Sequence, residues 1–236
     1  MKYAYLAYRV FGEAAKAAKP YFLDIREDMQ RANMNFTVEE YLSTSIFTAA
    51  LTFFLESISL AFIFGFLGFS LLVVILLSIT LSMTISGILV FLFYTYPATV
   101  SKNRENKIKK IIPFAVSYMA TVAISKLPPI ALFRTLSRFK EYGEVAEESK
   151  NITRDVEAFG MTFSTAIRKQ AKRTPSREFR ELLWGINSIF TSGGDMEFFL
   201  KQKGNELMAD YRRRIRKYSQ DISLFVEIYL TLIITG

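Results

Sequence analysis

Apolar and charged residues occupy separate stretches of this chain. Between Tyr41 and Ser101 the one charged residue is Glu56, and an apolar run extends from Ser45 to Pro97. One membrane-crossing helix needs about 20 apolar residues. The run is therefore long enough to cross a bilayer twice.

The two crossings are predicted to form a transmembrane helical hairpin over residues 44–97. The glycines of "GFLGFS" interrupt the run once and mark a tight turn. We expect one span near 44–64 and a second near 70–96. Pro97 should end the second span, because proline cannot donate a backbone N–H.

Two shorter apolar runs follow. "IIPFAVSYMATVAIS", Ile111 to Ser125, has 15 uncharged residues and is closed by Lys126-Leu-Pro-Pro. It is short for a span, so we interpret it as a buried core helix of a cytoplasmic domain. Residues 222–236 are apolar apart from Glu227, and they are predicted to be the start of a third transmembrane helix.

The segment 98–221 has helical rather than strand periodicity. Prolines and glycines divide it into short pieces, and within each piece the apolar residues recur every three or four positions. Two such stripes are Phe163, Ala166, Ile167 and Ala171, and then Phe179, Leu182, Leu183, Ile186, Ile189 and Phe190. Thr174 is a predicted N-cap, with Pro175 in the first turn of its helix. The segment therefore predicts a bundle of about six helices.

Charge sets the orientation of these parts. Six Lys and Arg residues precede the hairpin, five follow it closely, and the connecting turn has none. By the positive-inside rule both ends of the hairpin face the cytoplasm. We therefore expect an all-α, multi-pass protein of the cell membrane: a cytoplasmic N-terminal region (1–43), the hairpin, a cytoplasmic helical bundle, and a further transmembrane helix.

Composition excludes several kinds of chemistry. The chain has no Cys and no His, so thiolate or imidazole metal sites and Cys, His or Ser-His-Asp catalysis are excluded. It also has no phosphate-binding Gly-x-x-x-x-Gly-Lys-Ser/Thr loop. Residues 98–221 carry 24 basic and 14 acidic residues, too mixed a pattern for nucleic acid. We expect no cofactor.

"TSGGDMEFFL", Thr191 to Leu200, is similar to the Gly-Gly-Asp-Glu-Phe signature of cyclic-dinucleotide cyclases. That signature works on the turn of a β-hairpin, and no strand pattern flanks this stretch. We interpret it as a corner between helices. Gly193 and Gly194 should end one helix in the left-handed conformation, and Asp195 should cap the next.

The order of these parts resembles one family, the assembly-platform membrane proteins of type IV pili, archaella and type II secretion (the secretion-system F family), and its archaeal members in particular. The resemblance rests on "IIPFAVSYMATVAIS" with its proline break, on "EAFGMTFSTAIRKQAKRTPSREFRELLWGINSIFTSGGD", and on a basic helix leading into a span. It covers residues 105–236 well, and hydropathy carries the match over residues 1–104.

The resemblance implies a function. Platform proteins of this family are not enzymes; they couple a cytoplasmic hexameric secretion ATPase to the insertion or extraction of pilin-like subunits. Accordingly, the expected partners are that ATPase, pilin-like subunits and anionic lipid. We also expect the chain to form a homo-oligomer, namely a dimer. Many members have two bundle modules, whereas this chain shows one, which suggests a fragment or a short member.

Two basic clusters have an expected role. Within "RKQAKRTPSREFR", a docking face for the ATPase is one interpretation and a solvated helix face is the other; its basic residues are Arg168, Lys169, Lys172, Arg173, Arg177 and Arg180. "YRRRIRKY" lies just before the third span and is interpreted as an anchor on anionic lipid. The residues of this anchor are Arg212, Arg213, Arg214, Arg216 and Lys217.

Glu56 is an ionisable residue inside a span, where such groups are costly and often functional. We expect a hydrogen-bonded packing contact or a place beside a polar path, and a proton path is the alternative. Its candidate neighbours are Ser78, Ser82, Thr84, Ser86 and Glu227.

The final helix, from Asp195 toward residue 236, is expected to be one rod of about 60 Å. Gly204 is the weakest position within it.

Two other classes of protein share this hydropathy. A sensory membrane protein would also have two spans and a helical cytoplasmic region, and a channel or transporter fragment would explain the acids at 56 and 227. The short external turn and the absence of His speak against the first class, and the large basic bundle speaks against the second.

Overall fold

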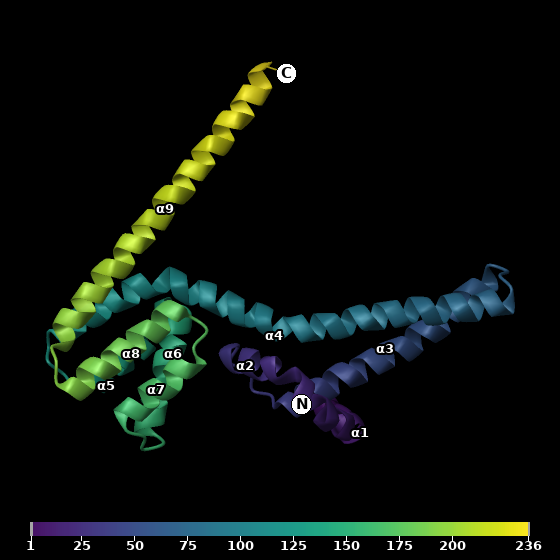
Figure 1. Cartoon of the computed structure of the whole chain (residues 1–236), viewed down its shortest axis with the longest axis horizontal. Helices are drawn as coiled ribbons and strands as arrows, with labels where there is room; N and C mark the ends of the chain where they lie inside the picture. The colour runs from purple at the N-terminus through teal and green to yellow at the C-terminus, as the bar shows by residue number, and fades with distance from the viewer. Residues whose placement is uncertain (1, 236) are drawn as a thin grey trace. The chain divides into compact units, whose positions relative to one another are not determined.

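The computed structural model describes residues 2–235, and these residues form helices without a strand. The all-α prediction is thereby confirmed. The α-helices are α1 (Lys2–Ala18), α2 (Leu23–Arg31), α3 (Val38–Phe66), α4 (Leu71–Ala123), α5 (Pro129–Arg138), α6 (Gly143–Glu157), α7 (Phe163–Arg173), α8 (Arg177–Ser192) and α9 (Met196–Thr235), with short 3-10 turns η1 (Lys19–Phe22) and η2 (Lys140–Tyr142) (Figure 1).

Two compact units divide between Asn103 and Arg104, within α4. The first unit contains α1, α2 and α3 with the N-terminal part of α4. Both α3 and α4 are long and apolar enough to cross a membrane, which agrees with the predicted hairpin. The short connection between them includes Gly68 with φ +82°, a left-handed conformation that glycine adopts without strain.

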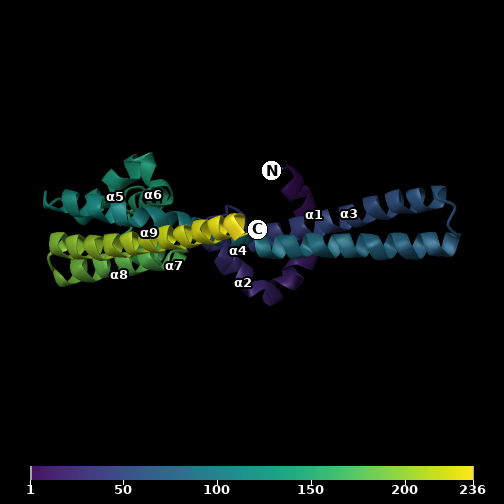
Figure 2. The same ribbon diagram turned by 90° about the horizontal axis from the view of Figure 1, so that it is seen from above.

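A capping box starts α3. The Thr37 hydroxyl accepts the backbone N–H of Glu40, and the Glu40 carboxylate accepts the backbone N–H of Thr37 at 2.9 Å. Farther along, α3 and α4 lie side by side (Figure 2). The Ser86 hydroxyl on α4 donates to the Ala49 carbonyl on α3 at 3.0 Å.

The expected helix end at Pro97 is wrong, because α4 continues from Leu71 to Ala123. A proline inside a helix leaves the carbonyl four residues earlier without its N–H donor. Here that carbonyl belongs to Phe93, and the Tyr41 hydroxyl of α3 donates to it at 2.7 Å. A side chain thus replaces the missing donor and the helix passes through. The run Ile111 to Ser125 is consequently the last part of α4 rather than a separate helix.

The second unit is the helical bundle, built from the C-terminal part of α4 and from α5 to α9. Its core is continuous and apolar. Fully buried members come from each helix and include Ile108, Ile112, Phe133, Ile152, Ile167, Phe179, Leu183, Ile186 and Leu200. The apolar stripes predicted on α7 and α8 lie in this core except at the end of the second stripe, where Ile189 is only partly buried and Phe190 is 42% exposed.

The connection between α7 and α8 differs from the prediction. Thr174 does not cap α8; it follows the end of α7 and is fully buried. Ser176 is the N-cap, and its hydroxyl accepts the backbone N–H of Phe179 at 3.2 Å. Pro175 separates the two residues and lies before the helix rather than in its first turn.

The helix α9 is long, and its two halves have different surroundings. Leu200, Gly204 and Leu207 are buried against the bundle, whereas every residue from Arg212 to Thr235 is exposed. Figure 1 shows this second half leaving the bundle. By hydropathy and length α9 is not among the helices that satisfy the criterion for a span. The third span over 222–236 stays a prediction, and Gly236 lies outside the described residues.

Candidate functional site

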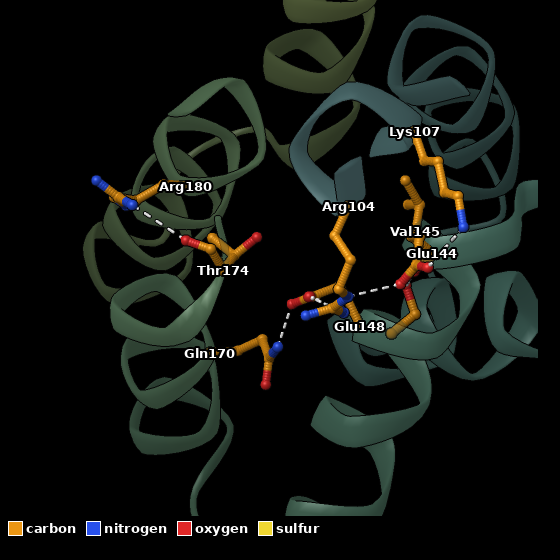
Figure 3. A network of polar contacts seen from close by, with 9 residues as sticks. Arg104, Lys107, Glu144, Val145, Glu148, Gln170, Thr174 and Arg180 are labelled. Carbon is orange, nitrogen blue, oxygen red and sulfur yellow. Dashed lines mark hydrogen bonds and ion pairs between the residues drawn. The ribbon is translucent and has the colours of Figure 1, made fainter. Parts of the chain in front are cut away.

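A buried polar network connects three helices of the bundle (Figure 3). Arg104 of α4 donates from Nε to Glu144 and from Nη2 to Glu148, both on α6 and both at 2.8 Å. The other carboxylate oxygen of Glu148 accepts a hydrogen bond from Gln170 of α7. The side chains of Arg104 and Glu148 are only 8% and 1% exposed. The network therefore fixes the positions of α6 and α7 against α4.

The electrostatics of this network are dominated by burial. Removal from water raises the pKa of Glu148, while the Arg104 charge and the hydrogen bonds from Gln170 and Arg104 oppose that rise. Glu144 adds a second negative charge beside the same arginine. Removing one partner of such a buried pair typically costs about 3–5 kcal/mol, because the other charge stays buried and uncompensated.

A second polar contact fixes α7. Lys169 donates to Asp155 of α6 at 2.7 Å, and the Asp155 side chain is 2% exposed. The second oxygen of Asp155 is buried and has no hydrogen-bond partner among the described residues. Lys169 thus forms an ion pair inside the bundle, although it was predicted to belong to the docking cluster.

The structure separates the six predicted docking residues into two groups. Besides Lys169, Arg177 pairs with Glu181 at 2.9 Å and Arg180 donates to the Thr174 carbonyl at 3.0 Å. The other three, Arg168, Lys172 and Arg173, are exposed on α7, and none of them pairs with a carboxylate within residues 2–235. We call these three residues the α7 basic face.

Two residues of the α7 basic face, Arg168 and Lys172, lie opposite the buried side of their helix. Residues 168 and 172 are four positions apart and share one side of α7, whereas Ala166, Ile167, Gln170 and Ala171 are buried on the other. Lys172 and Arg173 also lie in the last turn, where the helix dipole favours positive charge. An accessible cationic surface thus lies on a helix whose position is fixed from behind.

The corner between α8 and α9 has the geometry of a helix end followed by a helix start. Gly193 is left-handed with φ +70°, and the N–H of Gly194 donates to the Ile189 carbonyl at 3.0 Å. Gly194 itself is not left-handed, so that part of the expectation is wrong. One oxygen of Asp195 accepts the N–H of Phe198 at 3.0 Å. No strand flanks the corner in the described chain, which excludes the cyclase arrangement.

The basic stretch of α9 is divided in a similar way. Arg213 pairs with Asp210 one turn earlier, and Arg214 reaches the Lys109 carbonyl of α4 at 3.4 Å. Arg212, Arg216 and Lys217 are exposed and have no such contact within residues 2–235. These three remain available for a lipid surface.

Inside the hairpin, one carboxylate oxygen of Glu56 is buried without a hydrogen-bond partner in the described part of the chain, and so is the Ser82 hydroxyl. The hydroxyls of the other predicted neighbours on α4 donate to backbone carbonyls. Ser78 and Thr84 donate to carbonyls of their own helix, and Ser86 donates to Ala49. The structure therefore shows no hydrogen bond from these hydroxyls to Glu56.

The network around Arg104 was not predicted. Arg104 was counted as an orientation charge, and Glu144, Glu148 and Gln170 carried no expectation. The partners are separated by 40, 44 and 22 positions, so no local spacing indicated them. Across residues 2–235, no three potential metal-ligating side chains converge.

Comparison with known proteins identifies the family of this chain. The sequence model of the family described as type II secretion system (T2SS), protein F matches residues 115–236. The chain is 27% identical over 137 residues to flagella accessory protein J of Methanocaldococcus jannaschii. It is 27% identical over 139 residues to the protein of that name from Methanococcus voltae, and 24% identical over 143 residues to an uncharacterized protein of M. jannaschii.

These alignments cover 58–61% of this chain but 24–25% of each relative. The chain thus spans about a quarter of the length of the relatives it matches. No solved structure matches it significantly.

Proposed function

This chain belongs to the type II secretion system protein F family, and from that premise we propose that it forms all or part of a membrane assembly platform. The machine would be a type IV pilus-like, archaellum or type II secretion system. In this role the chain performs no catalysis. It couples a cytoplasmic hexameric secretion ATPase to the insertion or extraction of pilin-like subunits, and it acts as a homo-oligomer, a dimer.

The observation that carries this proposal is where the family match falls. It begins within α4 and includes α5 to α9, so it covers nearly the whole bundle. The α7 basic face lies inside the matched region, on a helix held by Gln170 and Lys169. A surface that receives force must keep its position under load, and these buried contacts supply that support.

We place the ATPase on the α7 basic face. The three exposed cations of the α7 basic face complement an acidic surface, and such complementarity accelerates association by about 10- to 1000-fold at low salt. This supports the docking interpretation of the cluster.

The proposed path of motion runs through the bundle into α9. Leu200, Gly204 and Leu207 pack α9 into the core, so a displaced bundle carries the helix with it. Arg212, Arg216 and Lys217 lie beyond this packed part, where each would contribute about 1 kcal/mol on anionic lipid. They would hold the moving helix at the membrane surface.

The test is charge reversal of the α7 basic face in the full chain, as Arg168→Glu, Lys172→Glu and Arg173→Glu together. A matched control reverses three exposed lysines elsewhere on the bundle, Lys126, Lys140 and Lys201, and so produces the same change in charge. Binding is measured in nanodiscs against the secretion ATPase encoded in the same gene neighbourhood, at several salt concentrations.

We expect the α7 variant to bind about tenfold or more weakly at low salt, with the difference shrinking as salt rises. The control variant should bind like the unmodified chain. Equal losses in both variants would mean that net charge, not this face, drives association. If the unmodified chain does not bind the ATPase at all, the platform role itself is contradicted.

A further inference from the structure

The helix α1 has three distinct sides. Ala7 and Ala15 are fully buried, and they mark the side that packs on α3. A charged side carries Arg9, Glu13 and Lys16, all exposed. Between them is an apolar side that is nevertheless uncovered: Tyr3, Leu6 and Val10 are 46%, 52% and 59% exposed.

Contacts place the start of α1 beside the membrane hairpin. The rings of Tyr3 and Phe11 pack edge-on against Phe47 of α3, with centroids 5.4 and 6.2 Å away. The hydroxyls of Tyr3 and Thr48 are 2.9 Å apart. Because Thr48 already donates to the Thr44 carbonyl, Tyr3 is the donor in this contact.

Phe47 and Thr48 belong to the first membrane-crossing helix. One to two turns farther along α3, the apolar side chains of Leu51, Phe54 and Leu55 are 45–64% exposed, as expected of side chains that face lipid. The uncovered apolar side of α1 therefore begins where the apolar surface of the hairpin begins, and the two are continuous through Phe47.

We propose that α1 is an interfacial helix whose apolar side, Tyr3, Leu6 and Val10, rests in the lipid bilayer surface beside α3. Tyrosine is enriched at this depth, because its ring is apolar and its hydroxyl is polar. The charged side of α1 then faces water and lipid headgroups, with Arg9 and Lys16 able to contact anionic ones. Lipid, rather than a protein partner, covers the exposed side chains.

The chain has no cysteine, which permits site-specific labelling without background. We suggest single substitutions Val10→Cys and, as a control at the same level of the helix, Arg9→Cys. Each full-length variant is labelled with an environment-sensitive fluorophore and reconstituted into vesicles of phosphatidylcholine and phosphatidylglycerol. Two quenchers are compared: a nitroxide attached to the lipid acyl chain and aqueous iodide.

The label at Val10 should have blue-shifted emission, lose most of its fluorescence to the nitroxide lipid and resist iodide. The label at Arg9 should show the opposite pattern. The proposal would be overturned if iodide quenched the labels at Val10 and Arg9 equally and the nitroxide lipid quenched neither. So would protection of Val10 from both quenchers, since that outcome means a protein, such as a second copy, covers this side.

A second variant guards against a loss of structure by the cysteine substitution itself. Leu6→Cys is one turn from Val10 on the same side of α1, and it should repeat the Val10 result. Disagreement between positions 6 and 10 would also contradict an interfacial helix, because the two side chains would then be at different depths.

Discussion

The hydroxyl of Tyr41 donates a hydrogen bond to the backbone carbonyl of Phe93, four residues before Pro97. The same relationship occurs at the other proline of α4. Pro113 leaves the Lys109 carbonyl without a helical donor, and the Arg214 guanidinium lies 3.4 Å from it. Each proline thus frees one carbonyl, and each carbonyl accepts from a side chain of a different helix.

Tyr41→Phe should destabilise the hairpin by about 1–3 kcal/mol, because it leaves a partly buried carbonyl without a donor. Unfolding of the full chain in mixed micelles, followed by circular dichroism, measures the loss. In a Pro97→Ala background the backbone N–H returns and Tyr41→Phe should cost little. An equal loss in both backgrounds would show that the hydroxyl acts elsewhere.

Gly185→Ala should destabilise the bundle. A Cβ at this position of α8 would overlap the Phe199 ring of α9 at Cζ and lie 2.8 Å from its Cε2. Overpacking costs about 1–3 kcal/mol, and better helix propensity returns at most about 1 kcal/mol. Thermal unfolding is followed by the fluorescence of Trp184, the single tryptophan of the chain.

Trimming the ring separates close packing from other effects of the Gly185 change. In a Phe199→Ala background the same alanine meets open space, so its cost should vanish or change sign. If Gly185→Ala lowers stability as much in the Phe199→Ala background as in the unmodified chain, the ring contact is not the cause.

Gly204→Ala should keep the bundle as stable or stabilise it by up to about 1 kcal/mol. The new Cβ would lie 3.6 Å from Ser117 of α4, which is ordinary van der Waals contact. Filament assembly in cells should also persist. Loss of filaments with an unchanged unfolding temperature would mean that Gly204 is a hinge, and that α9 does not act as one rod.

The contribution of Glu148 should depend on pH. Burial raises its folded-state pKa above the ordinary 4.5. Its stabilising contribution is therefore fully present below pH 4.5 and is lost as pH rises through the folded-state value. The unmodified chain and the Glu148→Gln variant are compared by their free energies of unfolding. The advantage of the unmodified chain should fall as the pH rises from 4.5 through the folded-state pKa of Glu148.

Glu147→Gln provides the control for this titration, because Glu147 is the preceding residue and its side chain is 59% exposed. Its difference from the unmodified chain should vary little with pH. A Glu148 difference that instead grows with pH would mean that pairing with Arg104 outweighs burial.

Local pattern indicated most of the apolar surfaces but not every helix boundary. Hydropathy indicated the hairpin, and apolar spacing indicated the core sides of α7 and α8. The rule that proline ends a helix failed at residue 97, because the replacement donor, Tyr41, is distant in the sequence. Thr174 and Ser176 both suit an N-cap, and the end of α7 decides between them.

The docking cluster shows the same limit. Its six basic residues are alike in sequence, yet Asp155, Glu181 and the Thr174 carbonyl engage three of them in the fold. Which cations stay without a partner in the described chain depends on the packing of α6 and α8 around α7. That packing depends in turn on Arg104 and Glu148, which are 44 positions apart.

The first half of α9 is packed in the bundle and its second half is exposed. A small movement of the packed half would therefore displace the far end of the helix by a larger distance. From Arg214, which contacts the Lys109 carbonyl of α4, 21 residues at 1.5 Å each give an arm of about 32 Å to Thr235. A tilt of about 5° at the packed base would move the far end sideways by about 3 Å over such an arm. Adjustments too small to break any core contact would then become strokes comparable to the width of a side chain.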